Sequence, residues 1–204
     1  MTDPLLKYRE QHKHRLNYMP WLYWSLKPKH REWAEAWQAE YQAYLMEMET
    51  IEIGKNCFIS PLAHIFAERG RKISIGDNTF IAADCTLHGP LQIGSEVAIN
   101  HHCILDGGRA GIKLHDQVRI AAYSHLYAFD HGMDLDRPIY QQAVTSKGIE
   151  IGRDVWLGAH VGIKDGVKIG HHAVVGMNSM VTKNIEDFAI VAGNPARLIR
   201  YRTE

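Results

Sequence analysis

One segment of the chain concentrates side chains that could do chemistry. Residues 127–148 read YAFDHGMDLDRPIYQQAVTSKG and place His131 beside Asp130, with Asp134 and Asp136 close behind. A histidine titrates near neutrality, so it can take a proton from a substrate and return it later. Asp130 or a backbone carbonyl could fix the tautomer of the ring, and the sequence does not choose between them. His131 is therefore the candidate catalytic base.

A second histidine competes for this role. His125 lies six residues earlier, where the chain still follows a regular repeat. That position favours a place on a regular surface, and a histidine at either position can also be an ordinary solvated side chain. We expect His131, rather than His125, to be the base.

The elements that position these residues follow from a repeat of six. Aliphatic residues occupy every sixth position in four runs, which together make 18 six-residue units, or hexads, at residues 53–65, 75–105, 114–126 and 151–181. A small or β-branched residue stands two positions before most of them, and residues two apart on an extended segment share a face. Each hexad therefore predicts a short strand with two inward side chains and a bend. Glycines such as Gly54 and Gly76, which follow the aliphatic residue, are expected to permit the bends.

Stacked coils of such strands form a solenoid with a continuous apolar column. Its faces are flat, so a site is expected between subunits or beneath an extruded loop. Residues 127–148 are by far the longest interruption of the repeat, and they are the predicted loop. The three cysteines fall in the small inward position without any CxxC pair, so we interpret them as buried apolar residues: Cys57, Cys85 and Cys103.

The two ends differ from the repeat. Residues 1–50 contain four of the five tryptophans, and apolar residues recur at helical spacing within 29–48. This predicts a helical cap over the open end of the solenoid. A helix at a membrane surface is the alternative, which five glutamates disfavour: Glu32, Glu35, Glu40, Glu47 and Glu49. The C-terminal tail, residues 187–204, contains the basic segment ARLIRYR, and we expect a short helix there.

Composition sets outer bounds. Lys plus Arg and Asp plus Glu both number 23, so no global charge indicates a nucleic-acid partner or a membrane surface. The apolar runs are too short to cross a bilayer, and the N-terminus lacks the apolar core of a signal peptide. The expected location is the cytoplasm.

Four motifs resemble the hexapeptide-repeat acyltransferase family: INHHCILDGG, FDHGMDLDRPIYQQAVTSK, IGRDVWLGAHV and VTKN followed by IVAGNPARLIR. Within it they are most similar to the sugar O-acetyltransferases, which include galactoside, maltose and capsular-polysaccharide acetyltransferases. The resemblance covers residues 51–200. It implies an all-β solenoid, a left-handed parallel β-helix with three hexads per coil, hence about six coils over residues 51–186. It also implies a homotrimer.

The resemblance implies acetyl-CoA as co-substrate, a sugar hydroxyl as acceptor and no metal. His131 matches the histidine that acts as base, while Asn100 and Asp130 fall on the acceptor side. The positions that match cofactor contacts are Ala159, Met177, Thr182, Lys183, Arg197 and Arg200, of which the first two contact through backbone amides. The sequence departs from the family at Met177, where a small residue is usual, and the thioether would narrow the channel for the pantetheine.

Other functions stay open. The runner-up is transfer to an amine, as in acetyltransferases of nucleotide amino sugars or antibiotics. A zinc enzyme resembling the β-helix carbonic anhydrases needs histidines stacked on one face, yet His88 and His125 occupy different positions within their hexads. A non-catalytic scaffold leaves the loop and the basic tail without a purpose. The sequence does not identify the acceptor.

Overall fold

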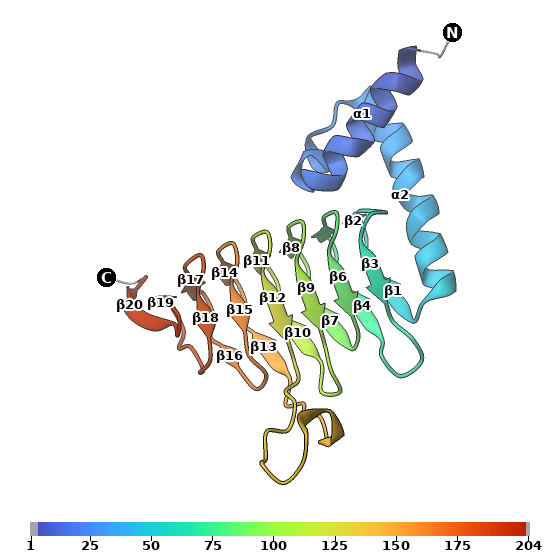
Figure 1. Cartoon of the computed structure of the whole chain (residues 1–204). Coiled ribbons are helices and arrows are strands. Elements are labelled where there is room, and N and C mark those ends of the chain that lie inside the picture. The colour runs from blue at the N-terminus through green and yellow to red at the C-terminus, as the bar shows by residue number, and fades with distance from the viewer. Residues whose placement is uncertain (1–3, 203–204) are drawn as a thin grey trace.

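The computed structural model describes residues 4–202, and the ends of the predicted cap and tail, residues 1–3 and 203–204, lie outside this range. Figure 1 shows a row of stacked coils with a helical arm at the N-terminal end and a long loop that leaves the side of the stack. The C-terminal strands lie at the opposite end from the arm.

Three parallel sheets form the walls of the solenoid. Sheet A contains β1 (Ile51–Ile53), β4 (Ile73–Ile75), β7 (Leu91–Ile93), β10 (Ile112–Leu114), β13 (Ile149–Ile151) and β16 (Lys168–Ile169). Sheet B contains β2 (Phe58–Ile59), β5 (Phe80–Ile81), β8 (Ala98–Ile99), β11 (Arg119–Ile120), β14 (Trp156–Leu157) and β17 (Val174–Val175), followed by β19 (Ala189–Ala192) and β20 (Arg197–Tyr201). Sheet C contains β3 (His64–Phe66), β6 (Thr86–His88), β9 (Ile104–Asp106), β12 (His125–Tyr127), β15 (Gly162–Ile163) and β18 (Met180–Val181). Each coil gives one strand to each sheet, so the prediction of six coils is confirmed, and the architecture matches a left-handed parallel β-helix.

The inward positions of the hexads form the core. Ile81, Leu87 and Ile99 have no exposed surface, and the three cysteines are buried and free. The Cys103 side chain and burial both raise the pKa of the Cys85 thiol, which keeps it protonated. The interpretation of the cysteines as buried apolar residues is confirmed.

The glycines that follow the aliphatic residues have a different role from the expected one. A Cβ on Gly54 would lie 2.7 Å from the carbonyl carbon of Gly76 in the next coil, so these residues permit close stacking. Left-handed backbone occurs two residues later and on residues other than glycine, such as Asn56 and Asn78, each with φ of 54°.

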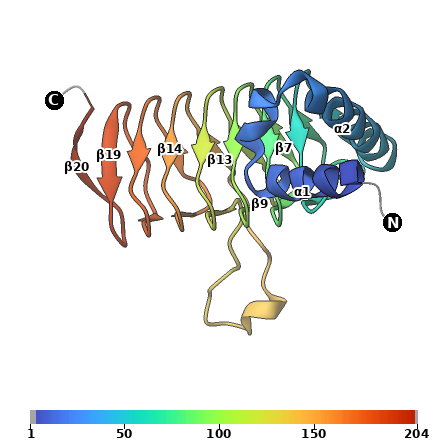
Figure 2. The ribbon, with the colours of Figure 1, turned by 90° about the horizontal axis from the view of Figure 1, so that it is seen from above.

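The N-terminal arm consists of α1 (Pro4–Tyr18), the 3-10 helix η1 (Pro20–Ser25) and α2 (Pro28–Met48). Leu45 of α2 joins the core of the first coil, as a cap requires. The arm also covers the outer face of sheet B, where a second apolar cluster contains Leu16, Tyr23, Ala34, Phe58, Phe80 and Ala98. Figure 2 shows the helices lying over the first coils. No helix within residues 4–202 is long and apolar enough to cross a membrane.

The predicted C-terminal helix is wrong. Residues 189–201 form an antiparallel hairpin of β19 and β20, and β19 pairs in parallel with β17. The physical reason is the open edge of the last coil, whose backbone groups need partners. The alternation of buried Ala189 and Val191 with half-buried Ile190 and Ala192 suits a strand.

We expect Leu105→Ala to lower the free energy of unfolding by about 2–5 kcal/mol, because Leu105 is fully buried between coils. Ile199→Ala is the control, since 63% of Ile199 is exposed, and it should change the free energy by about 0.5 kcal/mol or less. Urea unfolding followed by circular dichroism at one protein concentration measures both. Equal losses would contradict the assigned core.

Candidate functional site

The extruded loop is firmly attached at its base. Asp130 and Thr145 exchange two backbone hydrogen bonds of 2.9 Å, and the Ser146 hydroxyl donates to the Ala128 carbonyl. Beyond this base the tip exposes apolar side chains: Met133 is 75% exposed, Tyr140 82% and Leu135 fully. The chain therefore holds the loop out from the solenoid, and nothing in residues 4–202 covers these apolar side chains, which lie beside the exposed ion pair of Asp136 and Arg137.

His131 lies just beyond the base of this loop and is exposed. Its ring is 6.2 Å from that of Phe129, which lies 5.8 Å from Tyr127, so an aromatic row leads from β12 to the candidate base. The Asp130 carboxylate is 3.2 Å from the Lys164 ammonium. Asp130 therefore connects the loop to the solenoid through Lys164, and no hydrogen bond joins Asp130 and His131.

His125 takes the position expected of it. It is exposed on β12, and a Cβ on Gly162 of the neighbouring strand would lie 2.9 Å from its Nε2. The ring therefore rests on sheet C, between coils, and belongs to the solenoid surface.

Three predicted contact residues lie along the corner between sheets B and C. Asn100 follows β8 and donates from its amide to the Ile120 carbonyl at 2.9 Å. Ala159 and Met177 stand at equivalent places in successive coils, and the Ala159 carbonyl accepts a hydrogen bond from the Asn178 amide. Met177 is 63% exposed. The loop with His131 leaves from the other edge of sheet C, so one chain does not bring His131 to these residues.

The same corner carries a polar network that the sequence interpretation did not identify. The Tyr18 hydroxyl donates to Asp84 at 2.8 Å, and His102 Nε2 lies 3.6 Å from the same carboxylate. The Nδ1 atoms of His101 and His102 are 3.0 Å apart. Burial, and then the charge of His102, lower the pKa of His101. The 18-residue spacing of Asp84 and His102 was the available signal, since it stacks them in neighbouring coils.

The predicted cofactor contacts Thr182, Lys183, Arg197 and Arg200 divide between two places. Thr182, Lys183 and Arg197 line one cavity of about 350 Å³ beneath the C-terminal hairpin. Arg200 lines a different hollow, beside Trp156 on the outer face of sheet B. The structure therefore brings three of these four residues together.

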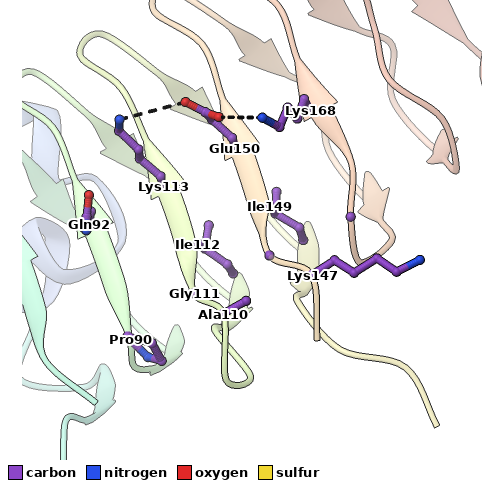
Figure 3. A pocket seen from close by; sticks show the side chains of 12 residues that line it. Pro90, Gln92, Ala110, Gly111, Ile112, Lys113, Lys147, Ile149, Glu150 and Lys168 are labelled. Atoms are coloured by element: carbon purple, nitrogen blue, oxygen red, sulfur yellow. Dashed lines mark ion pairs between the residues drawn. The ribbon is translucent and has the colours of Figure 1, made fainter. Parts of the chain in front are cut away.

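A cavity of about 520 Å³ lies on the outer face of sheet A. Figure 3 shows Lys113 and Lys168 on either side of Glu150, at 3.9 and 3.5 Å from its carboxylate. A hydrogen bond from His115 and then the two lysines lower the pKa of Glu150. Lys147 also lines the cavity, so its three lysines outnumber its one carboxylate. No predicted site residue lines it.

Within residues 4–202, no group of three or more His, Cys, Asp or Glu side chains lies close enough together to hold a metal ion.

Several known proteins resemble this chain in sequence. Residues 148–183 match the bacterial transferase hexapeptide family, described as six repeats. The putative colanic acid biosynthesis acetyltransferase WcaF of Escherichia coli is 28% identical over 185 residues, which cover 90% of this chain and 87% of that protein. A probable acetyltransferase of Mycobacterium tuberculosis is 32% identical over 136 residues, which cover 66% of this chain and 44% of that protein.

A solved structure extends the match. A variant of AntD, an N-acyltransferase from Bacillus cereus in complex with dTDP and coenzyme A, superposes with a TM-score of 0.71 and 32% identity, covering 79% of this chain and 89% of that one. The chain spans less than two thirds of the length of the first curated relatives that it matches, 44% for the mycobacterial protein. The fold, the repeat and these matches together place it in a definite class. The chain belongs to the hexapeptide-repeat transferase family.

Proposed function

We propose that the protein transfers an acetyl group from acetyl-CoA to a hydroxyl group of a sugar. The relatives support the class of reaction, since WcaF is a putative acetyltransferase of colanic acid biosynthesis and AntD was crystallised with coenzyme A. The chemistry needs a base, because a sugar hydroxyl attacks a thioester only as its proton is removed. His131 is that base in our proposal, and Asn100 contacts the acceptor.

The cofactor lies along the corner between sheets B and C at the C-terminal end. The backbone of Ala159 and Met177 contacts the pantetheine, while Thr182, Lys183 and Arg197 hold phosphate groups at the end cavity. Arginine and lysine suit this task, because they donate charged hydrogen bonds to phosphate oxygens. Arg200 contacts the nucleotide if it extends onto the outer face of sheet B.

One observation carries the assembly part of the proposal. His131 and the cofactor corner lie at opposite edges of sheet C, and the loop that bears His131 ends in exposed Met133, Leu135 and Tyr140. An apolar tip of this kind indicates a protein partner. In a closed homotrimer, the loop of one chain reaches the corner of the next, and each site is shared.

Transfer to an amine is the second candidate. It is favoured by the likeness to AntD, an N-acyltransferase. An amine is a stronger nucleophile than a hydroxyl, so such a reaction depends less on a base at position 131. A thiol-release assay against a panel of sugars, amino sugars and nucleotide sugars distinguishes the two.

Replacing His131 tests the mechanism. His131→Ala should lower kcat by about 10²–10⁴-fold while acetyl-CoA still binds, which is the usual contribution of a general base. His131→Asn should be equally slow, because an amide cannot accept the proton. His125→Ala is the control, and it should lower kcat only slightly. If His125→Ala abolishes turnover and His131→Ala does not, the base lies on sheet C.

Replacing the basic residues tests the cofactor position. Lys183→Ala and Arg197→Ala should raise the KM for acetyl-CoA by about tenfold or more, because a charged hydrogen bond contributes about 1.5–3 kcal/mol. Their kcat should change less. Arg69→Ala is the control and should leave the KM unchanged, because Arg69 is exposed in the first coil, at the other end of the solenoid. If Arg200→Ala raises the KM as much as Lys183→Ala and Arg197→Ala do, the nucleotide lies across sheet B. If none of the three variants raises the KM, the proposed cofactor site is rejected.

Mixed assemblies test whether the sites are shared. At acetyl-CoA concentrations below the wild-type KM, His131→Ala chains and Lys183→Ala/Arg197→Ala chains should each be slow alone. Co-expressed chains should regain activity, because some sites then combine an intact loop with an intact corner. The control is co-expression of His131→Ala with His131→Asn, which should regain nothing. A monomer by light scattering, or no recovery in the mixed sample, would contradict the shared site.

A further inference from the structure

The N-terminal arm encloses a cavity that is distinct from the acyl-transfer site. It has a volume of about 360 Å³ and lies between α1, η1 and the start of α2. The arm lies at the opposite end of the solenoid from β19 and β20 (Figure 1). The cavity that contains Lys183 is lined by residues of these two strands. Small-molecule sites commonly fall in this size range, which begins at roughly 300 Å³.

The charges around this cavity are all of one sign. Its lining contains Arg15, Lys27 and Lys29, together with His12 and His30, and no acidic residue. Within residues 4–202, no carboxylate lies within 4.0 Å of those three cations. The neighbouring Glu10 forms its ion pair with a different residue, Lys13. The cavity therefore concentrates positive charge that the described chain does not neutralise.

The same imbalance extends along the arm. Residues 4–31 contain seven Lys or Arg residues and one Glu. The rings of His12 and His30 lie 4.6 Å apart at the cavity. Burial, then His30 and the cations Arg15 and Lys29, lower the pKa of His12. Mutual repulsion of this kind is relieved when an anion binds between the charges.

The floor of the cavity is apolar. Leu16 is buried, and Leu22 and Leu26 are half-buried beside it. A cationic rim over an apolar floor complements a ligand with an anionic head and an apolar body. A phosphate monoester carries a charge of about −1.5 to −2 at neutral pH, so it neutralises three cations more fully than one carboxylate does.

We propose that the cavity between α1, η1 and α2 binds an organic phosphate, with the phosphate held by Arg15, Lys27 and Lys29 and the apolar portion resting on Leu16, Leu22 and Leu26. This site is independent of acyl transfer. The phosphate can belong to a soluble molecule or to a lipid headgroup, and the chemistry of recognition is the same.

The probe is phenyl phosphate, which is titrated into the protein by calorimetry at constant ionic strength. Coenzyme A is present throughout to occupy the proposed cofactor site at the C-terminal end of the solenoid. We expect saturable binding at least about tenfold tighter than that of phenol or inorganic phosphate, each of which lacks half of the ligand. Arg15→Ala/Lys29→Ala should weaken binding by about tenfold or more. Lys7→Ala is the matched control on α1, since Lys7 does not line the cavity, and it should bind as the wild type does.

The double variant Arg15→Ala/Lys29→Ala should fold, because it removes charges that repel one another, and its melting temperature checks this. If its melting temperature is lowered, Arg15→Gln replaces it, because glutamine keeps much of the side-chain stem. Vesicles with phosphatidic acid distinguish the sources. Vesicle binding that the double variant loses assigns the phosphate to a lipid, and binding of phenyl phosphate alone assigns it to a soluble molecule. Absence of saturable binding, or an equal loss in Lys7→Ala, would overturn the proposal.

Discussion

Close stacking of successive coils is the constraint on which the rest of the structure depends. Strand partners in neighbouring coils pair in parallel, and each coil must present an aliphatic and a small side chain inward in each sheet. The spacing leaves no room for a Cβ at Gly54 or Gly76. A core built in this way has no interior cavity to offer a ligand, so binding sites can only occupy corners, insertions and ends. Ala159 and Met177 occupy a corner, His131 an insertion and Arg197 an end.

The parts of the fold set by local spacing were predictable, and the parts set by a tertiary partner were not. The hexads state the inward positions directly, so the short strands and the buried cysteines followed from them. The number of coils also needed the three hexads per coil that the family resemblance implied. The C-terminal hairpin did not, because its basic sequence carries no strong preference and the free edge of β17 decides its conformation. The position of the arm over sheet B had a usable signal, since Phe58 and Phe80 point outward on paired strands and need a cover.

The candidate site shows the same division. His131 could be found because an insertion in a strict repeat is conspicuous. Ala159 and Met177 could not be found from their side chains, since their proposed contacts are made by the backbone, and only the resemblance to a family indicated them. The pairing of Asp130 with Lys164 could not be predicted, because the two residues are distant in sequence and meet only where the base of the loop joins the solenoid. The proximity of His131 to the cofactor corner is even harder to predict from one sequence, because we propose that it exists only between chains.

Overall charge illustrates why composition constrains function so weakly. The chain has equal numbers of acidic and basic residues, which indicates no charged partner when it is taken as a whole. Yet the described part of the arm before α2 is strongly basic, and the acidic residues that balance it, such as Glu40 and Glu47, lie farther along α2. Electrostatic attraction between exposed charges decays over roughly 10 Å in physiological salt, so a ligand responds to the local cluster and not to the sum. A neutral protein can therefore present a cationic cavity at one end and, at the other, the basic side chains that we propose to bind the cofactor phosphates.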